Sequence, residues 1–233
     1  MINNFDPNIS ITLQLIRLHR KTVKTPYFIR VIFSWFKKNL TGSCGVFLRF
    51  SNKRKETFKP NQTLENLIDN WSGKPKIIYM SGDYEDPIYH PKHDKIHTLS
   101  KGFFSNPLMY YQLMFHELGH STMHPKRMNR EVFHTINEDL TQEEMDFIEA
   151  EEELLVTYFS IKSCLISNPD IKQLNQIMWF NSNIFSKFVE VICEQNSEYN
   201  FKDLEDEADR LIDYMLNQIN KDEKTNYNSY ESV

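Results

Sequence analysis

One motif limits the fold of this 233-residue chain more than any other, the run His116-Glu117-Leu118-Gly119-His120. In an α-helix with about 3.6 residues per turn, positions i and i+4 lie on the same face. His116 and His120 would therefore project together and could share a tetrahedral Zn²⁺ through their imidazole nitrogens. Glu117 lies beside them, where its carboxylate can accept a proton from water activated by the metal without being a ligand itself. The motif arises by chance in on the order of a few per cent of such chains, so its context must support it.

The residues around the motif are typical of a buried helix. Asn106 and Pro107 suit the N-cap and the first helical position. The apolar residues that follow are Leu108, Tyr111, Leu113, Met114, Phe115 and Leu118. The helix is expected to end near His124-Pro125, because proline disfavours helical backbone in the residue before it. Gly119 costs about 1 kcal/mol relative to alanine inside a helix, and we expect the close approach of another backbone segment to explain it.

A second helix is expected to supply a third ligand. Thr141 and Glu144 have the spacing of a capping box, which predicts a helix from there to about residue 167. A carboxylate from a second helix is the usual third ligand when the first helix supplies two histidines. Glu152 and Glu153 directly precede the apolar run Leu154-Leu155-Val156, so at least one of them should point toward the core. A solvated glutamate face is the alternative.

His124, eight residues after His116, is a further ligand candidate. It would lie on nearly the same helix face, but about 6 Å beyond His120 along the helix axis. We therefore expect an outer or structural role for His124. The three-histidine metalloprotease pattern, which needs a glycine turn and a wider spacing, is absent.

Residues before the motif helix predict a small amount of β-structure. Apolar and β-branched runs predict strands at residues 76–80, 87–90 and 95–99. The last two strands are separated by a turn at residues 91–94, so they should pair as a short hairpin directly before the motif helix.

Amphipathic stretches after residue 167 predict two more helices, near residues 171–195 and 201–219. Residues 221–233 are polar and are expected to form a disordered tail. Together these patterns predict an α+β chain. A small basic N-terminal layer that contains β-structure, residues 1–72, precedes a mostly helical domain, residues 73–220.

Charge is distributed unevenly along the chain. Residues 1–60 contain 12 Lys and Arg against two Asp and Glu, a balance of +10, whereas the remainder carries −15. Aromatic side chains interleaved with cations can stack on the bases of single-stranded DNA and neutralise its phosphates. The candidate DNA contacts are Lys37, Lys38, Arg49, Lys53, Arg54 and Lys55. The alternative is a small core layer with buried aromatics and solvated charges.

Composition argues against a membrane or secreted protein. No apolar run approaches the ~18 residues needed to span a bilayer, and the first residues lack the charged and then apolar pattern of a secretory signal. Cys44, Cys164 and Cys193 match neither a disulfide framework nor a C-x-x-C metal site. We therefore expect a protein of the reducing cytoplasm with no membrane partner.

Several segments, taken together, carry a family resemblance. They are Tyr89-His90-Pro91, Asp94-Lys95-Ile96, Tyr110-Tyr111, the His116–His120 motif, Thr122, His124, Arg127, Met128, Arg130 and the run from Glu152 to Thr157. These segments resemble the zincin-like metallopeptidase domain of ArdC-type antirestriction proteins, which occur on plasmids, phages and other mobile elements. Residues 45–64 weakly resemble the end of that family's N-terminal domain, which binds single-stranded DNA.

The resemblance implies a zinc site and names its third ligand. By position the ligand would be Glu153, with Glu152, one helical step away, as the alternative. Tyr111, His124 and Arg127 match family positions around the site and are expected to support it or the surrounding structure.

The implied activity is hydrolysis of a peptide bond in a protein substrate, with Glu117 as the general base. An alternative is an antirestriction factor that binds single-stranded DNA and keeps the zinc site for structure or as a vestige. Thr157 motivates this alternative, because the family commonly has an additional acid there. A further alternative is a protease of a mobile element that cleaves a repressor.

Overall fold

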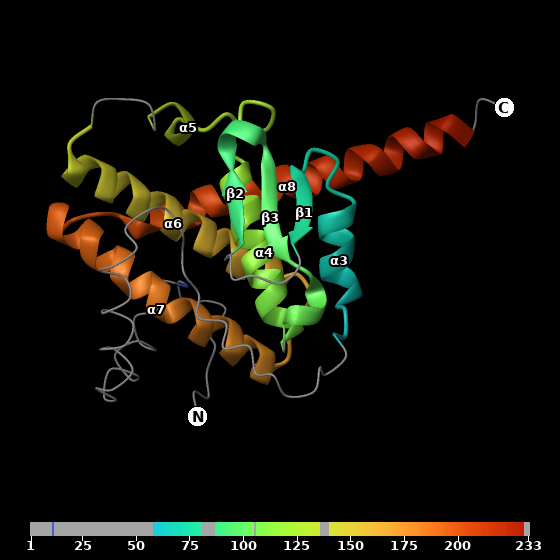
Figure 1. The fold of residues 1–233 in the computed structure, drawn as a ribbon, viewed down its shortest axis with the longest axis horizontal. Coiled ribbons are helices and arrows are strands. Elements are labelled where there is room, and N and C mark those ends of the chain that lie inside the picture. Colours follow the sequence, from blue (N-terminus) through green and yellow to red (C-terminus); the bar gives the residue numbers. More distant parts are fainter. Residues whose placement is uncertain (1–10, 12–57, 81–86, 105, 136–139, 231–233) are drawn as a thin grey trace.

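The computed structural model describes residue 11 and residues 58–80, 87–104, 106–135 and 140–230 (Figure 1). Helices predominate among these residues, together with one three-stranded sheet, so the α+β class is confirmed. The basic region expected to contact DNA lies outside the described residues. Its candidates, which stay predictions, are Lys37, Lys38, Arg49, Lys53, Arg54 and Lys55.

The sheet contains the three predicted strands, β1 (Lys76–Met80), β2 (Ile88–His90) and β3 (Lys95–Leu99). β3 lies in the middle, parallel to β1 and antiparallel to β2. The β2–β3 hairpin turns through a short 3₁₀ helix, η1 (Pro91–His93), and Asp94 follows it with left-handed backbone at φ 49°. Aspartate tolerates this conformation better than most residues. Because β3 is the middle strand, β2 lies at an edge of the sheet, and it packs beside the motif helix.

The motif lies in α4 (Pro107–Ser121), which is buried on almost all sides. Asn106 caps the helix as predicted, since its side chain accepts a hydrogen bond of 3.0 Å from the backbone N–H of Leu108. The helix ends at Ser121, earlier than expected. The Ser121 and Thr122 hydroxyls each donate a 2.6 Å hydrogen bond to a carbonyl of the preceding turn, which favours a helix end. His124 therefore does not share the helical face of the two motif histidines.

Helix α6 (Gln142–Leu165) is the central helix of the described structure. It begins with the predicted capping box of Thr141 and Glu144. It packs against α4 on one side and against α7 (Ile171–Gln195) and α8 (Phe201–Tyr230) on others (Figure 1). Most of its residues from Ala150 onward are buried, so α4 and α6 face each other inside the core.

Segments before residue 73 join the same core. Helix α3 (Gln62–Asp69) buries its apolar face, and the indole of Trp71 is fully buried with its ring centroid 6.5 Å from that of Phe159 on α6. The core thus begins N-terminal to the domain boundary that we expected at residue 73. Two short elements, η2 (Lys101–Phe103) and α5 (Val132–Thr135), flank α4 in the chain.

Helix α8 continues through Tyr230, and its C-terminal part projects from the body of the molecule (Figure 1). The helix thus extends into the segment, from residue 221, that we expected to form a disordered tail. Neither glycine nor proline occurs between Phe201 and Tyr230, so no residue interrupts propagation of the helix. Within the described part of the chain, no helix has the length and apolar character required to cross a membrane.

Candidate metal centre

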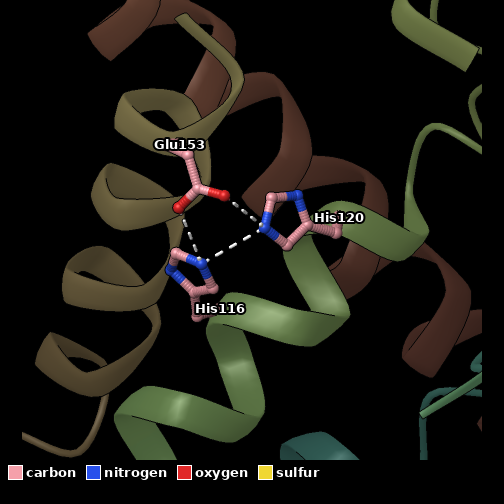
Figure 2. Close-up of side chains that lie close together, drawn as sticks. All are labelled: His116, His120 and Glu153. Carbon is pink, nitrogen blue, oxygen red and sulfur yellow. Dashed lines mark hydrogen bonds and ion pairs between the residues drawn. The ribbon is translucent and has the colours of Figure 1, made fainter. Parts of the chain in front are cut away.

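Helices α4 and α6 bring three metal-binding side chains together. His116 and His120 project from α4 toward Glu153 on α6 (Figure 2). The two histidine Nε2 atoms are 3.2 Å apart. Glu153 Oε2 lies 3.3 Å from His116 Nε2, and Glu153 Oε1 lies 3.4 Å from His120 Nε2. One nitrogen or oxygen donor from each residue lies within 4.8 Å of the other two, so this group could hold a single ion.

These separations fit Zn²⁺. Ligand atoms at about 2.0–2.1 Å from a tetrahedral zinc lie about 3.3 Å from one another. Glu153 Oε2 is buried and receives no hydrogen bond among the residues that the structure describes; its near neighbour is His116 Nε2 at 3.3 Å. A metal ion bound by both atoms would supply the positive charge that a buried carboxylate needs. Two histidines and one glutamate are also a donor set of catalytic zinc sites. The donor atoms and their spacing therefore suit zinc.

Gly119 allows the two helices to approach closely. A Cβ atom on this residue would lie 3.0 Å from Val156 Cβ and 3.1 Å from Phe159 Cδ1, both on α6. Helix α6 is the segment that approaches there, and the atoms nearest to the missing Cβ belong to its side chains. The missing Cβ brings α4 near enough to α6 for Glu153 to reach the histidines.

Glu117 lies beside the histidines and is held by the sheet. Its side chain is buried, and Oε2 accepts a 2.6 Å hydrogen bond from the backbone N–H of Tyr89 in the edge strand β2. Burial raises the pKa of Glu117, the charges of His116 and His120 oppose this change, and Glu153 adds to it. The carboxylate is thus fixed in position and more basic than an exposed glutamate.

Glu152 contacts the outer side of His120 and is not part of the three-residue group. Its Oε1 lies 3.0 Å from His120 Nδ1. Arg130 binds both carboxylate oxygens, with NH2 at 2.7 Å from Oε1 and NH1 at 2.5 Å from Oε2. Burial raises the pKa of Glu152, but Arg130 and His120 outweigh burial and lower it to about 2. Of the two adjacent glutamates, only Glu153 faces the Nε2 atoms.

Two of the residues expected to support the site lie away from the ligands. The Tyr111 hydroxyl donates a 2.6 Å hydrogen bond to Glu65 Oε1 and accepts one of 2.9 Å from the backbone N–H of Asn61. Tyr111 therefore ties α4 to α3. His124 lies beyond the end of α4, with Nδ1 4.0 Å from Asp94 Oδ2, so it contacts the hairpin turn.

Arg127 connects the loop after α4 to the β2–β3 hairpin. Its guanidinium group is paired with Asp94 and donates a 3.1 Å hydrogen bond to the hydroxyl of Tyr89. It also donates to the carbonyls of Gly73 (3.0 Å) and Ser121 (2.5 Å). This network holds the strand whose backbone N–H binds Glu117. From the sequence, Tyr89 and Asp94 were named among the segments that carry the family resemblance, but no role was predicted for either residue.

Comparisons with known proteins agree with this geometry. Residues 67–169, which include both motif histidines and Glu153, match the family model described as zincin-like metallopeptidase. The chain is also similar to the DNA primase TraC of Escherichia coli, with 38% identity over 65 residues. This segment is 28% of the present chain and only 6% of the primase. No solved structure matches the chain. Residues 67–169 are thus similar to zincin-like metallopeptidases.

Proposed function

We propose that this domain binds one Zn²⁺ through His116, His120 and Glu153 and hydrolyses peptide bonds in a protein substrate. The observation that carries the proposal is the set of nearly equal donor separations, 3.2 to 3.4 Å, next to the buried Glu117. Three protein ligands are typical of catalytic zinc sites, whereas structural sites usually have four. The family match supports the same conclusion.

The proposed mechanism assigns proton transfer to Glu117. When bound, Zn²⁺ would make water nucleophilic near neutral pH and polarise the carbonyl group of the substrate. Glu117 accepts the proton that the attacking water loses and then donates it to the leaving amine nitrogen. The hydrogen bond from Tyr89 fixes Oε2, which leaves Oε1 for proton transfer. Burial, which raises the pKa of Glu117, suits a group that must both accept and release a proton.

The substitution Glu117→Gln tests this proposal. Glutamine has nearly the same size but cannot accept the proton, so we expect full zinc content and a loss of cleavage of roughly 100-fold or more. Zinc is measured by atomic spectrometry, and cleavage by mass spectrometry of a peptide library. Glu194→Gln, on the exposed end of α7, is the matched control. Equal cleavage by wild type and Glu117→Gln would overturn the assigned role, and a wild-type protein without zinc under zinc-replete conditions would overturn the site.

A second candidate function is an ArdC-like antirestriction factor that binds single-stranded DNA. Two observations favour it: the balance of +10 over residues 1–60, and the similarity over 65 residues to a DNA primase. In this case the zinc site would stabilise the fold, and the N-terminal cations would perform the function. A protease that cleaves a repressor of a mobile element would instead share the chemistry of Glu117, and a substrate screen distinguishes it from a general peptidase.

Binding to single-stranded oligonucleotides at several salt concentrations tests the second candidate. Replacing Arg54 and Lys55 with alanine removes two cations, so affinity should fall and the salt dependence should become about 1–2 units shallower on a logarithmic plot. Glu117→Gln is the control and should bind DNA like wild type. If Glu117→Gln alone abolishes protection against restriction in cells, the DNA-binding candidate is wrong.

A further inference from the structure

We infer that Glu152 and Arg130 form a positioning pair that sets the orientation and the proton position of the zinc ligand His120. In this arrangement His120 donates its Nδ1–H to Glu152, and its Nε2 lone pair faces the metal. This inference rests on the zinc-binding part of the proposed function and names the residues that prepare one ligand for it.

Glu152 contacts His120 on the side of the ring that faces away from the other two ligands. Glu152 Oε1 lies 3.0 Å from His120 Nδ1, on the side of the ring opposite to the Nε2 atom that faces His116 and Glu153. A carboxylate paired with a guanidinium through two bonds is an ionised acceptor and has no proton to donate. The proton in the contact therefore belongs to His120 Nδ1. A neutral imidazole with its proton on Nδ1 has its lone pair on Nε2, which is the nitrogen that the other two ligands face.

Arg130 links Glu152 to the end of α4. Arg130 reaches Glu152 from the loop after α4 and also donates a 2.9 Å hydrogen bond from Nε to Thr122 Oγ1. Its NH2 group lies 3.4 Å from the carbonyl of Gly119. Arg130 is thus bound to the last turn of the helix that carries His120 and to the carboxylate that His120 contacts. The pair fixes α6 and the end of α4 relative to each other around this one imidazole.

The burial of the pair argues that it has a specific role. The side chains of Glu152 and Arg130 are only 9% and 10% exposed. A buried ion pair is often no more stabilising than apolar side chains of the same size, so stability alone is a weak explanation. Hydrogen bonds from a metal-binding histidine to an outer carboxylate typically change metal affinity 10- to 100-fold. Glu152 also supplies an outer carboxylate on α6, where Thr157 offers none.

The substitution Glu152→Gln tests the inference by zinc affinity, measured by competition with a chelator at fixed pH. Glutamine loses the charge that Arg130 requires, and its amide can rotate to present a donor to His120. The dissociation constant for zinc should rise 10- to 100-fold. The visible spectrum of the Co²⁺-loaded variant should also change, because the ring of His120 is no longer held. The control is Glu151→Gln, which alters the adjacent glutamate, bonded at 2.6 Å by the hydroxyl of Tyr199, and should leave both readouts unchanged.

A folded Glu152→Gln variant that binds zinc within twofold of wild type would overturn the inference. If this variant does not fold, Arg130→Lys decides. Lysine keeps a positive charge opposite Glu152 but cannot make two parallel bonds, so zinc affinity should fall, and unchanged affinity would overturn the inference. Peptide cleavage is not a readout here. A wild-type protein that binds zinc but cleaves nothing would overturn only the proposed peptidase function, whereas failure to bind zinc would overturn both.

Discussion

The three glutamates at the candidate metal centre, Glu117, Glu152 and Glu153, differ in their surroundings and therefore in their pKa. Glu117 is buried against a backbone N–H and two histidines, and its pKa is raised. Burial also raises the pKa of Glu152 and Glu153, but Arg130 and the histidines outweigh it and lower both. An elevated pKa suits proton transfer, and a lowered pKa keeps a carboxylate ionised as a ligand or acceptor. The neighbours of each residue therefore explain the division of roles.

The lowered pKa of Glu152 predicts a pH-dependent stability in zinc-free protein. In the unfolded chain a glutamate has a pKa of about 4.3, whereas that of folded Glu152 is about 2. The stabilising contribution, on the order of 3 kcal/mol, is therefore fully present above pH 4.3 and is lost as the pH falls toward 2. In urea titrations with EDTA, Glu152→Gln should be less stable than wild type at pH 7, and this difference should shrink below pH 4.3. A difference that stays constant down to pH 2 would contradict this prediction, and Glu194→Gln should follow wild type throughout.

The elements of the site are held by one contact of α4 and one contact of the loop that follows it. Gly119 lets α6 approach within side-chain contact, and Arg127 links the loop after α4 to the β2–β3 hairpin. The first contact sets the distance between the histidines and Glu153. The second holds the strand that binds Glu117. Each contact can be changed without replacing a proposed ligand or the proposed base.

Gly119→Ala should weaken zinc binding although alanine favours helix. Alanine gains about 1 kcal/mol in helix propensity, but its Cβ would lie 3.0 Å from Val156 Cβ. Overpacking of this kind costs typically 1–3 kcal/mol and pushes elements apart. We expect a melting temperature unchanged or lowered by a few degrees and a zinc affinity reduced severalfold.

Combining Gly119→Ala with Val156→Ala provides the matched control, because it removes the side chain that the new methyl group would meet. Zinc affinity should return toward the wild-type value, although the smaller core side chain lowers stability. If the single and double variants bind zinc equally weakly, crowding between α4 and α6 is not the cause.

Arg127→Met should destabilise the domain strongly. The Arg127 side chain is 1% exposed and paired with Asp94, and removing one partner of a buried pair costs about 3–5 kcal/mol. Urea denaturation measures the loss. Lys126→Met is the control, since Lys126 also lies near Asp94, at 3.7 Å, but its side chain is 74% exposed. Its loss should cost less than about 1 kcal/mol. Similar losses in both variants would show that the buried network is not what stabilises the hairpin.

Across the whole molecule, the features predicted correctly from the sequence are those that local sequence patterns determine. The motif helix, its Asn106 cap, the hairpin and the capping box at Thr141 all follow from residues close together in the chain. Local pattern left the choice between Glu152 and Glu153 open, and it was the family resemblance that named Glu153. Neighbouring residues on a helix point about 100° apart, so the crossing of α4 and α6 decides which of the two faces the histidines.

Other features of the structure could not be predicted from local sequence patterns, because they depend on tertiary contacts or on the continuity of a helix. The partners of Arg127 and Arg130 come from distant segments, and a backbone donor such as the Tyr89 N–H leaves no trace in residue type. The polar composition after residue 221 predicted disorder, although no glycine or proline ends α8 before Tyr230. In these cases contacts or chain continuity, and not local pattern, decided the structure.

The proposed zinc centre is tested most directly by an anomalous-scattering crystal structure of the zinc-loaded protein, recorded on both sides of the zinc absorption edge. We expect one zinc peak per chain, about 2.0–2.2 Å from His116 Nε2, His120 Nε2 and a carboxylate oxygen of Glu153. Glu152 should remain on Arg130 and His120 Nδ1. A peak bound by Glu152 in place of Glu153, or no peak between α4 and α6, would contradict the proposed centre.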